Sequence, residues 1–280
     1  MSPMSMDSGL RMKRSIAAIV STLKSYRQLS REYPEIENRV ELAIERALGR
    51  FPRRLRARFR DSTVEFASCG SIPLLYIYQE IYRDLCYLPP HWDAEECFGP
   101  GKTVLDIGAN IGLFAIFAAR QGCSVYAIEP NPSNYCYLLE NVRLNSLATI
   151  YSQNFAFSNV DGCGELFVAE QPSGSSLVRS QSVGSRFSVP VKTRRLESFL
   201  AEILEPHIDL LKIDCEGGEY DILLNSGPET LERICRVSME FHNGVNSHTS
   251  ADIVSHLSRN GFSVEVKEST PSFGFIWAHR

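Results

Sequence analysis

From about residue 62 onward, short runs rich in β-branched and aromatic residues alternate with segments of helical periodicity. This alternation is typical of βαβ units and predicts an α/β fold with a mostly parallel sheet. The expected strands are residues 103–106, 124–129, 149–155, 208–213 and 237–240, and the main expected helices are 111–120, 134–145 and 196–204. Residues 262–267 and 272–277 predict a closing antiparallel pair of strands around a turn that contains Pro271.

The residues before this pattern differ from it in charge. Residues 1–60 carry 14 Lys and Arg against 6 Asp and Glu, a net charge of +8, whereas the rest carries 15 against 27, a net charge of −12. We expect residues 1–61 to form a helical extension whose first ten residues are disordered, because those ten are polar and rich in Ser and Met. Residues 62–280 would then form the α/β domain.

The extension contains two amphipathic helical patterns, the second of which places apolar residues between Ile36 and Phe51 on one face. We expect these apolar faces to pack on the α/β domain or on a second copy of the chain, which would give a homodimer through the N-terminal helices. Pro52 would start a further turn, and the Arg-rich segment 50–60 is expected to be a solvated helix face. An anionic substrate, a phosphate backbone or a lipid surface is the alternative ligand of that segment.

Composition excludes several classes of protein. With 44% hydrophobic and 22% charged residues, the chain is of ordinary globular composition and is neither collagen-like nor wholly disordered. Its eight cysteines are scattered singly, which favours reduced thiols in a cytoplasmic protein over zinc ligands or a disulfide framework. The apolar run at residues 15–23 is too short for a membrane span and no small-residue cleavage site follows it.

The strongest local signal is V-L-D-I-G-A-N-I-G at residues 104–112. The strand ends in Asp106, the chain turns through Gly108 and Asn110, and a helix starts near Gly112. Glycines allow a tight turn and a close approach to a ligand, but the spacing is not the G-x-G-x-x-G of dinucleotide-binding proteins. An acid at the strand end would repel a pyrophosphate, whereas it would suit a ligand that bears an ammonium and a sulfonium group.

The second signal is Glu129, which ends the next strand and is followed by Pro130 and Asn131. An acid at this place accepts two hydrogen bonds from a ribose diol. Together the two motifs indicate a phosphate-free nucleoside, and S-adenosylmethionine meets that description. Asn154 and Phe155, at the end of the third strand, are then expected beside the edge and the face of the adenine.

Two later motifs carry further acids: L-K-I-D-C-E-G-G-E at residues 211–219 and V-S-M-E-F-H at residues 237–242. Asp214 and Glu240 end strands, so both are expected to face the crevice at the carboxyl ends of the sheet. Asp214, Glu216, Glu240 and His242 are therefore candidates for removing a proton from a substrate, either directly or through a divalent cation. For Glu216, capping of the following helix is the competing interpretation.

These residues resemble the FkbM family of S-adenosylmethionine-dependent methyltransferases. The resemblance covers about residues 104–242 and includes D-I-G-A-N-x-G, E-P, L-L-E-N-V-R-L-N, K-I-D-x-E-G-x-E and the final E-x-H. It implies a class I methyltransferase with a Rossmann-like seven-stranded sheet whose last strand is antiparallel. One departure is R-L-E at residues 195–197, where the family usually has T-L-D, and this leaves the role of Glu197 open.

The expected activity is O-methylation of a hydroxyl or a carboxylate of a small molecule, such as a secondary metabolite, a sugar or an organic acid. A carboxylate acceptor is already ionised at neutral pH and needs no base. One alternative is a non-catalytic binding protein that retains the fold. Another is an RNA methyltransferase that uses the basic arm, although the N-P-P-Y and D-P-P-Y tetrapeptides are absent and no nucleic-acid partner is expected. A nicotinamide oxidoreductase is disfavoured by the glycine spacing.

Overall fold

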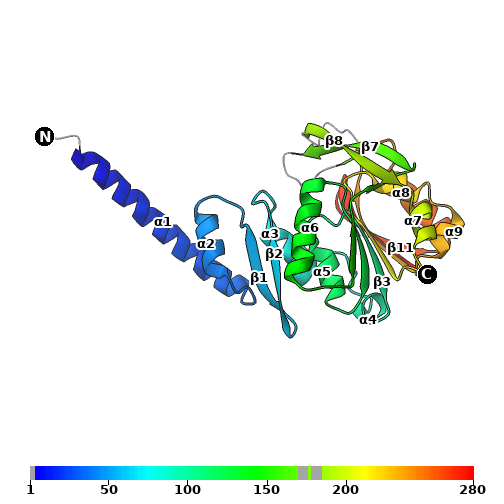
Figure 1. The fold of residues 1–280 in the computed structure, drawn as a ribbon, viewed down its shortest axis with the longest axis horizontal. Coiled ribbons are helices and arrows are strands. Elements are labelled where there is room, and N and C mark those ends of the chain that lie inside the picture. Colours follow the sequence, from blue (N-terminus) through cyan, green and yellow to red (C-terminus); the bar gives the residue numbers. More distant parts are fainter. Residues whose placement is uncertain (1–3, 170–175, 178–184) are drawn as a thin grey trace. The chain divides into compact units, whose positions relative to one another are not determined.

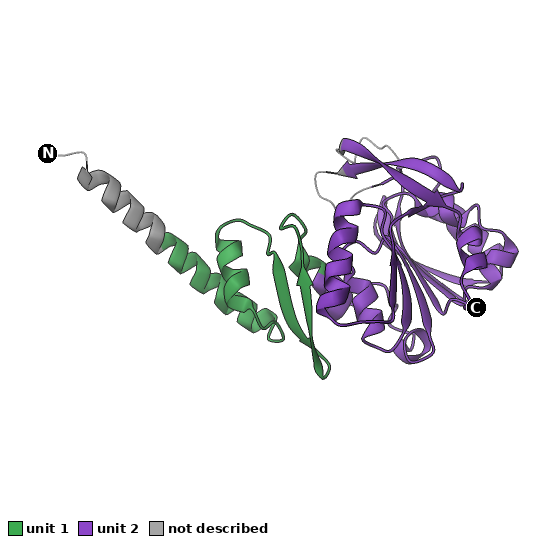
Figure 2. Cartoon of the chain, in the orientation of Figure 1, with its two compact units in different colours: residues 1–77 green, residues 78–280 purple. Residues whose placement is uncertain are grey.

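The computed structural model describes residues 4–169, 176–177 and 185–280. The chain divides into two compact units, unit 1 (residues 1–77) and unit 2 (residues 78–280), which Figure 2 distinguishes by colour. The predicted boundary at residues 61 and 62 falls inside unit 1. Among the described residues, no helix combines the length and the apolar character that crossing a bilayer demands.

Unit 2 is built on a mixed sheet whose strand order, among the described residues, is β11-β12-β10-β9-β3-β4-β5. The strands are β3 (Thr103–Ile107), β4 (Ser124–Ile128), β5 (Ile150–Gln153), β9 (Leu210–Ile213), β10 (Arg236–His242), β11 (Ser263–Thr270) and β12 (Phe273–His279). Strands β10, β9, β3, β4 and β5 run parallel to their neighbours, whereas β12 is antiparallel to both β10 and β11. The predicted seven-stranded sheet with an antiparallel last strand is therefore confirmed within the described residues.

Helices cover both faces of this sheet. They are η1 (Gln79–Arg83, a π-helix), α4 (Ala94–Cys97), α5 (Leu113–Ala119), α6 (Pro132–Leu144), α7 (Leu196–Glu202), α8 (Glu219–Leu223), α9 (Pro228–Glu232) and α10 (Ser250–Arg259). Figure 1 shows α5 and α6 on one side of the central strands and α7, α8 and α9 on the other. The parallel strands are thereby buried on both faces, which is why β3 and β9 consist of fully buried residues.

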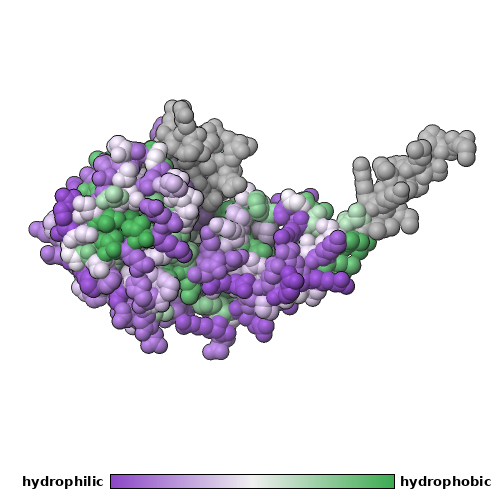
Figure 3. Space-filling view, turned by 180° about the vertical axis from the view of Figure 1, so that it is seen from behind, coloured by the Kyte–Doolittle hydropathy of each residue, from purple (hydrophilic) through white to green (hydrophobic). Residues whose placement is uncertain are grey.

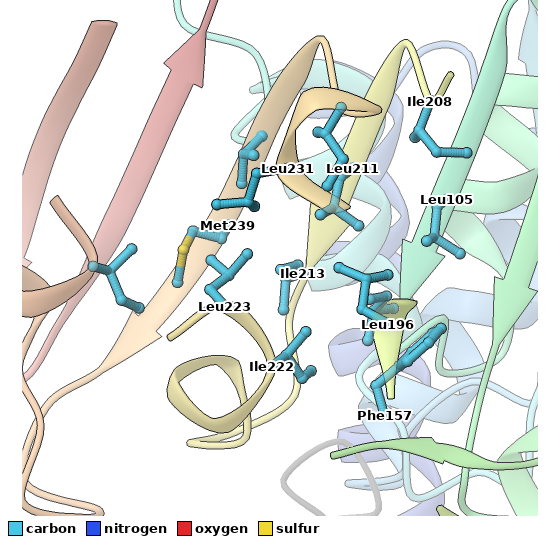
Figure 4. Close-up of a cluster of buried hydrophobic side chains, with 14 of the residues drawn as sticks. Leu105, Phe157, Leu196, Ile208, Leu211, Ile213, Ile222, Leu223, Leu231 and Met239 are labelled. Carbon is cyan, nitrogen blue, oxygen red and sulfur yellow. The ribbon is translucent and has the colours of Figure 1, made fainter. Parts of the chain in front are cut away.

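The hydrophobic core of unit 2 lies between the central strands and the helices α7, α8 and α9 (Figure 4). Leu105 and Leu211 extend from neighbouring strands toward Leu196, Leu223 and other apolar side chains. Burial of an aliphatic side chain stabilises the fold by about 1.5–3 kcal/mol. This packing fixes the positions at which the parallel strands end, and therefore the positions of the side chains that follow them.

Local polar contacts set the starts of two helices. Asn131 caps α6, since its side chain accepts the backbone N–H of Ser133, and Pro132 occupies the first helical position. At the start of α7, Asp161 accepts the N–H of Arg195 at 2.9 Å and the hydroxyl of Ser198 at 2.7 Å. Arg195 precedes the helix and provides no side-chain cap of its own.

A second, smaller sheet in unit 2 has the order β6-β8-β7 among the described residues. Its strands are β6 (Ala156–Phe157), β7 (Gly162–Ala169) and β8 (Ser185–Arg194). It contains much of the insertion that was expected at residues 158–192, of which 170–175 and 178–184 lie outside the described residues. Strand β8 is antiparallel to β7 and parallel to β6.

Unit 1 contains a hairpin where a further helical turn was expected. Its elements are α1 (Met4–Glu32), α2 (Arg39–Ala47), β1 (Arg54–Phe59), β2 (Ser62–Ala67) and α3 (Leu74–Tyr78), the last of which reaches the unit boundary. The helical interpretation of the Arg-rich segment is wrong, because Arg56 and Arg58 point outward while Leu55 and Ala57 are buried, which is the two-residue period of a strand. Arg56 lies 3.5 Å from Glu37, within ion-pair distance.

The helices of unit 1 also differ from expectation. Residues 4–10 are part of α1, whereas residues 1–3 lie outside the described residues. The disorder expected for the first ten residues stays a prediction. In α2 the buried residues are Leu42 and Ala43, whereas Val40 and Ile44, expected on the packed face, are 57% and 44% exposed. Figure 3 shows hydrophobic residues also on the described part of α1. A homodimer through these faces stays a prediction.

Candidate active site

A pocket lies at the carboxyl ends of β3, β4 and β9, where open α/β sheets bind their ligands. Its empty volume is about 620 Å³ with the open mouth included. We call one end the nucleoside half (Gly108, Asn110, Glu129 and Phe155). The other end, together with the cluster beside it, is the acidic half (Asp214, Glu216, Glu240 and His242), of which Glu240 and His242 are not among the residues that line the pocket. Gly108, Asn110, Glu129, Phe155, Asp214 and Glu216 line the pocket directly.

The turn after β3 forms one wall of the nucleoside half. Gly108 has φ of +76°, and a Cβ at this position would lie 1.8 Å from the carbonyl oxygen of Asp214. Glycine is therefore required at this position for two reasons. The backbone of Asp214 passes too close for a Cβ, and the positive φ is one that other residues rarely adopt. Asn110 is also left-handed, with φ of +52°, and its buried Oδ1 has no hydrogen-bond partner among the described residues. The residue lines the pocket, but this oxygen is itself buried.

Glu129 is held by backbone donors on both sides. Its Oε2 accepts the N–H of Asn110 at 2.8 Å and its Oε1 accepts the N–H of Asn131 at 2.9 Å. The residue is only 5% exposed, and burial raises the pKa of its carboxyl to about 7 although the backbone hydrogen bonds oppose this. The side chain of Asn134 also donates to this carboxylate, so three of its about four acceptor sites are used and one is left for a ribose hydroxyl.

Apolar side chains complete the nucleoside half. Phe155 and Phe157 meet edge to face with ring centroids 5.0 Å apart, and Leu166 and Leu177 of the insertion line the same pocket. A planar, weakly polar group such as an adenine fits between side chains of this kind. The small sheet thus contributes to the pocket wall.

Asp106 does not line the pocket. Its carboxylate is fully buried, and the Nζ of Lys212 lies 3.1 Å from it. Lys212 also donates to the carbonyl of Gly108 at 3.0 Å, so the pair supports the turn from beneath. A ligand in the pocket has no direct access to this carboxylate, which the sequence analysis had assigned to an ammonium group.

Three other predicted cofactor residues lie behind the pocket wall. Gly112 starts α5 with φ of +92°, and a Cβ there would meet the side chain of Leu138 in α6 at 2.5 Å. Asn131 caps α6 and orients Glu129 through its N–H. Asn154 donates its amide to the carbonyl of Glu129 at 2.7 Å. These residues shape the nucleoside half and do not border it.

The four predicted catalytic residues come together in the acidic half. The Nε2 of His242 lies 3.2 Å from Glu240 and 3.5 Å from Glu216. Asp214 is close enough that its carboxylate, that of Glu240 and a ring nitrogen of His242 lie within 4.8 Å of one another. Glu216 has φ of +51°, a backbone strain of about 1–3 kcal/mol that is common at functional sites. Residues from two strand ends thus form one cluster.

The charges of this cluster perturb one another. Burial and repulsion from Asp214 raise the pKa of Glu216 to about 7 and that of Glu240 to about 8. Burial lowers the pKa of His242, but its hydrogen bonds to Glu219 and Glu240 outweigh burial and raise the pKa to about 11. At neutral pH the ring is therefore an imidazolium, and the two glutamates titrate in the neutral range.

Sequence reasoning missed three residues that support the site. Lys212 interrupts the apolar run of β9, and a lysine in a buried strand signals a buried acidic partner. Burial lowers its pKa, but Asp106 and Asp214 raise it further, so the ammonium stays charged. Tyr87 donates its hydroxyl to Asp214 at 2.8 Å, and no sequence signal marks it. The third is Glu219, which lies 3.1 Å from Nδ1 of His242.

The acidic half also offers the donor types that a divalent cation accepts, namely two carboxylates and an imidazole. In this structure the Nε2 of His242 faces Glu240 at 3.2 Å. A metal ion and the imidazolium proton would therefore compete for the same nitrogen.

The residues of the pocket fit S-adenosylmethionine. Glu129 offers an acceptor for a ribose hydroxyl, and the phenylalanines offer an apolar wall. Asp214 and Glu216 in the same pocket suit the positive charge of a sulfonium. No phosphate-binding array is needed for such a ligand.

Several known methyltransferases are similar in sequence to this chain. Residues 106–264 match the methyltransferase FkbM domain. A relative from Streptomyces tacrolimicus, 31-O-demethyl-FK506 methyltransferase FkbM, is 27% identical over 78% of this chain and 92% of that protein. Methyltransferase 1 of Beauveria bassiana is 25% identical over 74% of this chain and 88% of that protein.

Other matches are local or distant. The tRNA (guanine(37)-N(1))-methyltransferase of Mus musculus is 33% identical over 30% of this chain and 16% of that protein. Among solved structures, precorrin-6y C5,15-methyltransferase from Geobacter metallireducens aligns with a TM-score of 0.45 and 15% identity, covering 77% of this chain and 95% of that one. The family match spans more than half of the chain and contains the motifs of both halves of the pocket. The chain therefore belongs to the FkbM family and is an S-adenosylmethionine-dependent methyltransferase.

Proposed function

We propose that this enzyme methylates a hydroxyl oxygen of a small molecule, and that the acidic half of the pocket holds the acceptor. The supporting observation is that Glu240 and Glu216 both lie close to the His242 imidazole, at 3.2 Å and 3.5 Å from its Nε2. A hydroxyl must lose its proton as its oxygen attacks the methyl carbon. Glu240, with a pKa of about 8, and Glu216, with a pKa of about 7, are matched to accept that proton near neutral pH.

The same cluster disfavours a carboxylate acceptor, which the sequence analysis had left open. Five acids, Asp106, Asp214, Glu216, Glu219 and Glu240, surround two bases, Lys212 and His242. An additional negative charge 4 Å from an unpaired carboxylate costs about 4 kcal/mol at an effective dielectric constant of about 20. A neutral hydroxyl avoids this repulsion and uses the proton acceptors that a carboxylate would not need.

Each half of the pocket then has its own task. When bound, S-adenosylmethionine supplies a methyl group activated by a sulfonium. Glu129 and Asn110 hold the nucleoside, and the phenylalanine wall excludes water from it. Glu240 accepts the hydroxyl proton of the acceptor, while Asp214, held by Tyr87 at 2.8 Å, lies on the same side of the pocket. The name of the Streptomyces tacrolimicus relative, which describes methylation at an oxygen, supports this proposal.

The direct test uses cofactor with a trideuterated methyl group. The full chain is incubated with a panel of small alcohols, sugars and phenols, each paired with the corresponding carboxylic acid, and products are identified by mass spectrometry. We expect label on hydroxyl members of the panel. Glu240→Gln should lower kcat at least about 100-fold while the cofactor affinity stays within about threefold. Labelling of carboxylic acids alone would contradict the proposal.

A second candidate acceptor is RNA. Unit 1 carries 14 Lys and Arg against 8 Asp and Glu, a net charge of +6, and β1 presents Arg54, Arg56 and Arg58 on its exposed side. The local matches to tRNA methyltransferases point the same way. Binding of total tRNA at low salt that weakens steeply as salt rises, together with label transfer to it, would favour this acceptor.

A further inference from the structure

Glu219 is a buried carboxylate that the proposed proton transfer does not use. Its side chain has an exposed fraction of 0%, at the first residue of α8. Oε1 accepts the backbone N–H of His242 at 2.8 Å and lies 3.1 Å from Nδ1 of the same residue. Oε2 accepts the N–H of Gly217 at 2.7 Å. The side chain therefore joins the loop after β9 to the end of β10.

We propose that Glu219 is a positioning residue, which holds the His242 imidazole by Nδ1 and thereby directs Nε2 toward Glu216 and Glu240. This inference rests on the proposed function, because it assigns a task to a residue behind the proton-accepting glutamates. A carboxylate against one ring nitrogen fixes both the orientation of the ring and the proton on that nitrogen. The other nitrogen then faces the pocket in a defined state.

The geometry separates this role from helix capping. An acid that only stabilises a helix start accepts N–H groups of its own first turn. Glu219 instead directs Oε1 across to the neighbouring strand, where the ring and the backbone of His242 both meet it. The contact to the ring nitrogen has no function in capping α8. A ring held only by packing would leave this nitrogen to solvent or to a neutral acceptor.

The consequence for the acidic half is a fixed positive charge among carboxylates. The ionisable groups that face the ring are Glu219 from α8, Glu216 from the loop after β9, and Glu240 from β10, with Asp214 within 4.8 Å of the group. On the side of β12, Phe273 lies 5.9 Å from the ring. An imidazolium at this point stabilises the ionised forms of Glu216 and Glu240, the forms that accept a proton. Glu219 thus acts on the reaction through His242.

Nuclear magnetic resonance of the ring nitrogens tests this without any acceptor. The full chain is labelled with ¹⁵N-histidine, EDTA is added to exclude metal binding, and the His242 signals are assigned with His242→Gln. In the wild type we expect both ring nitrogens to be protonated at pH 7.5 and up to above about pH 9. In Glu219→Gln the midpoint should fall by about 1–3 units below that of the wild type, since one charged partner contributes about that much.

The control removes an acid from an exposed pair of the same type. Glu265 lies 3.4 Å from His91, and both side chains are about half exposed. Glu265→Gln should leave the His242 signals unchanged, because this exposed pair is remote from the ring and surface pairs contribute little. Where Glu219→Gln does not fold, Glu219→Asp, which keeps the charge on a shorter arm, should give a midpoint between those of the wild type and of an unpaired histidine.

Two outcomes would overturn the proposal. One is a wild-type ring that is neutral at pH 7.5 with its proton on Nε2. The other is a folded Glu219→Gln variant whose His242 titrates as in the wild type, which would reduce Glu219 to a link between loop and strand. Because none of these measurements needs methyl transfer, failure to find a hydroxyl acceptor would sink the proposed function and leave the positioning role intact.

Discussion

The nucleoside half and the acidic half of the pocket are built by different forces. In the nucleoside half, backbone atoms do most of the positioning: Gly108 passes against the carbonyl of Asp214, and Glu129 is held by two backbone N–H groups. In the acidic half, side-chain charges hold one another, and His242 lies between carboxylates on both ring nitrogens. We therefore expect substitutions in the first half to change folding and cofactor affinity, and substitutions in the second to change proton transfer.

The largest expected effect comes from the backbone crossing in the nucleoside half. In Gly108→Ala the new Cβ would overlap the carbonyl oxygen of Asp214 at a φ of +76°, so the two loops must separate. We expect the free energy of unfolding to fall by more than about 4 kcal/mol, or the protein not to fold at all. Gly227→Ala is the control, because a Cβ there meets nothing within 4 Å and φ is −76°. Equal urea midpoints for both variants would refute the crossing argument.

The next effect tests the lysine beneath both halves. Lys212 is 4% exposed and pairs with Asp106, so Lys212→Met leaves a fully buried carboxylate without its partner. We expect a loss of about 3–4 kcal/mol in the free energy of unfolding, measured by urea denaturation. Adding Asp106→Asn should recover at least about 1 kcal/mol of that loss, since no buried charge then remains unpaired. A double variant that is less stable than Lys212→Met would show that the two side chains do not form the proposed pair.

For the nucleoside half, the sequence predicted the positions of the residues better than it predicted the contacts that these residues make. Strand ends and glycine turns follow from local patterns, so the positions of Gly108, Asn110 and Glu129 were found from residue order alone. Their exact contacts depend on neighbouring strands. That the carboxylate of Asp106 is buried against Lys212 follows from the pairing of β3 with β9, which are about 100 residues apart in the chain. No local pattern specifies such a pairing.

The acidic half shows the same division. The rule that ligands bind at strand ends predicted that Asp214 and Glu240 lie close together. It did not predict the hydrogen bond from Tyr87 to Asp214, because Tyr87 lies far earlier in the chain. In unit 1 the error had a different origin. The arginine-rich stretch was assigned to a helix, although its strict alternation with Leu55 and Ala57 fits a strand. The helical interpretation was based on the density of arginines, whereas the two-residue alternation of exposed and buried residues is the feature that distinguishes a strand from a helix.

A moderate loss of cofactor affinity is expected from substitutions in the nucleoside half. Glu129→Ala removes the carboxylate that accepts a ribose hydroxyl, and we expect the cofactor affinity to fall about 30-fold, or about 2 kcal/mol, by isothermal titration calorimetry. Asn154→Ala, behind the wall, should cost no more than about threefold, because its amide only supports the backbone of Glu129. Similar affinities for Glu129→Ala and wild type would remove Glu129 from the cofactor site.

The smallest expected effect is a pH dependence of the affinity for S-adenosylmethionine. It shows whether a carboxyl of the nucleoside half or one of the acidic half controls cofactor binding. Burial raises the pKa of Glu129 to about 7, and ribose hydroxyls donate to the ionised form. Only about one carboxyl in eleven is ionised at pH 6, against about three in four at pH 7.5, so the affinity for S-adenosylmethionine should rise up to about eightfold over this range. The sign follows because deprotonation creates the acceptor. In Glu129→Gln the rise should be largely lost, whereas Glu240→Gln should retain it; the reverse pattern would place the controlling carboxyl in the acidic half.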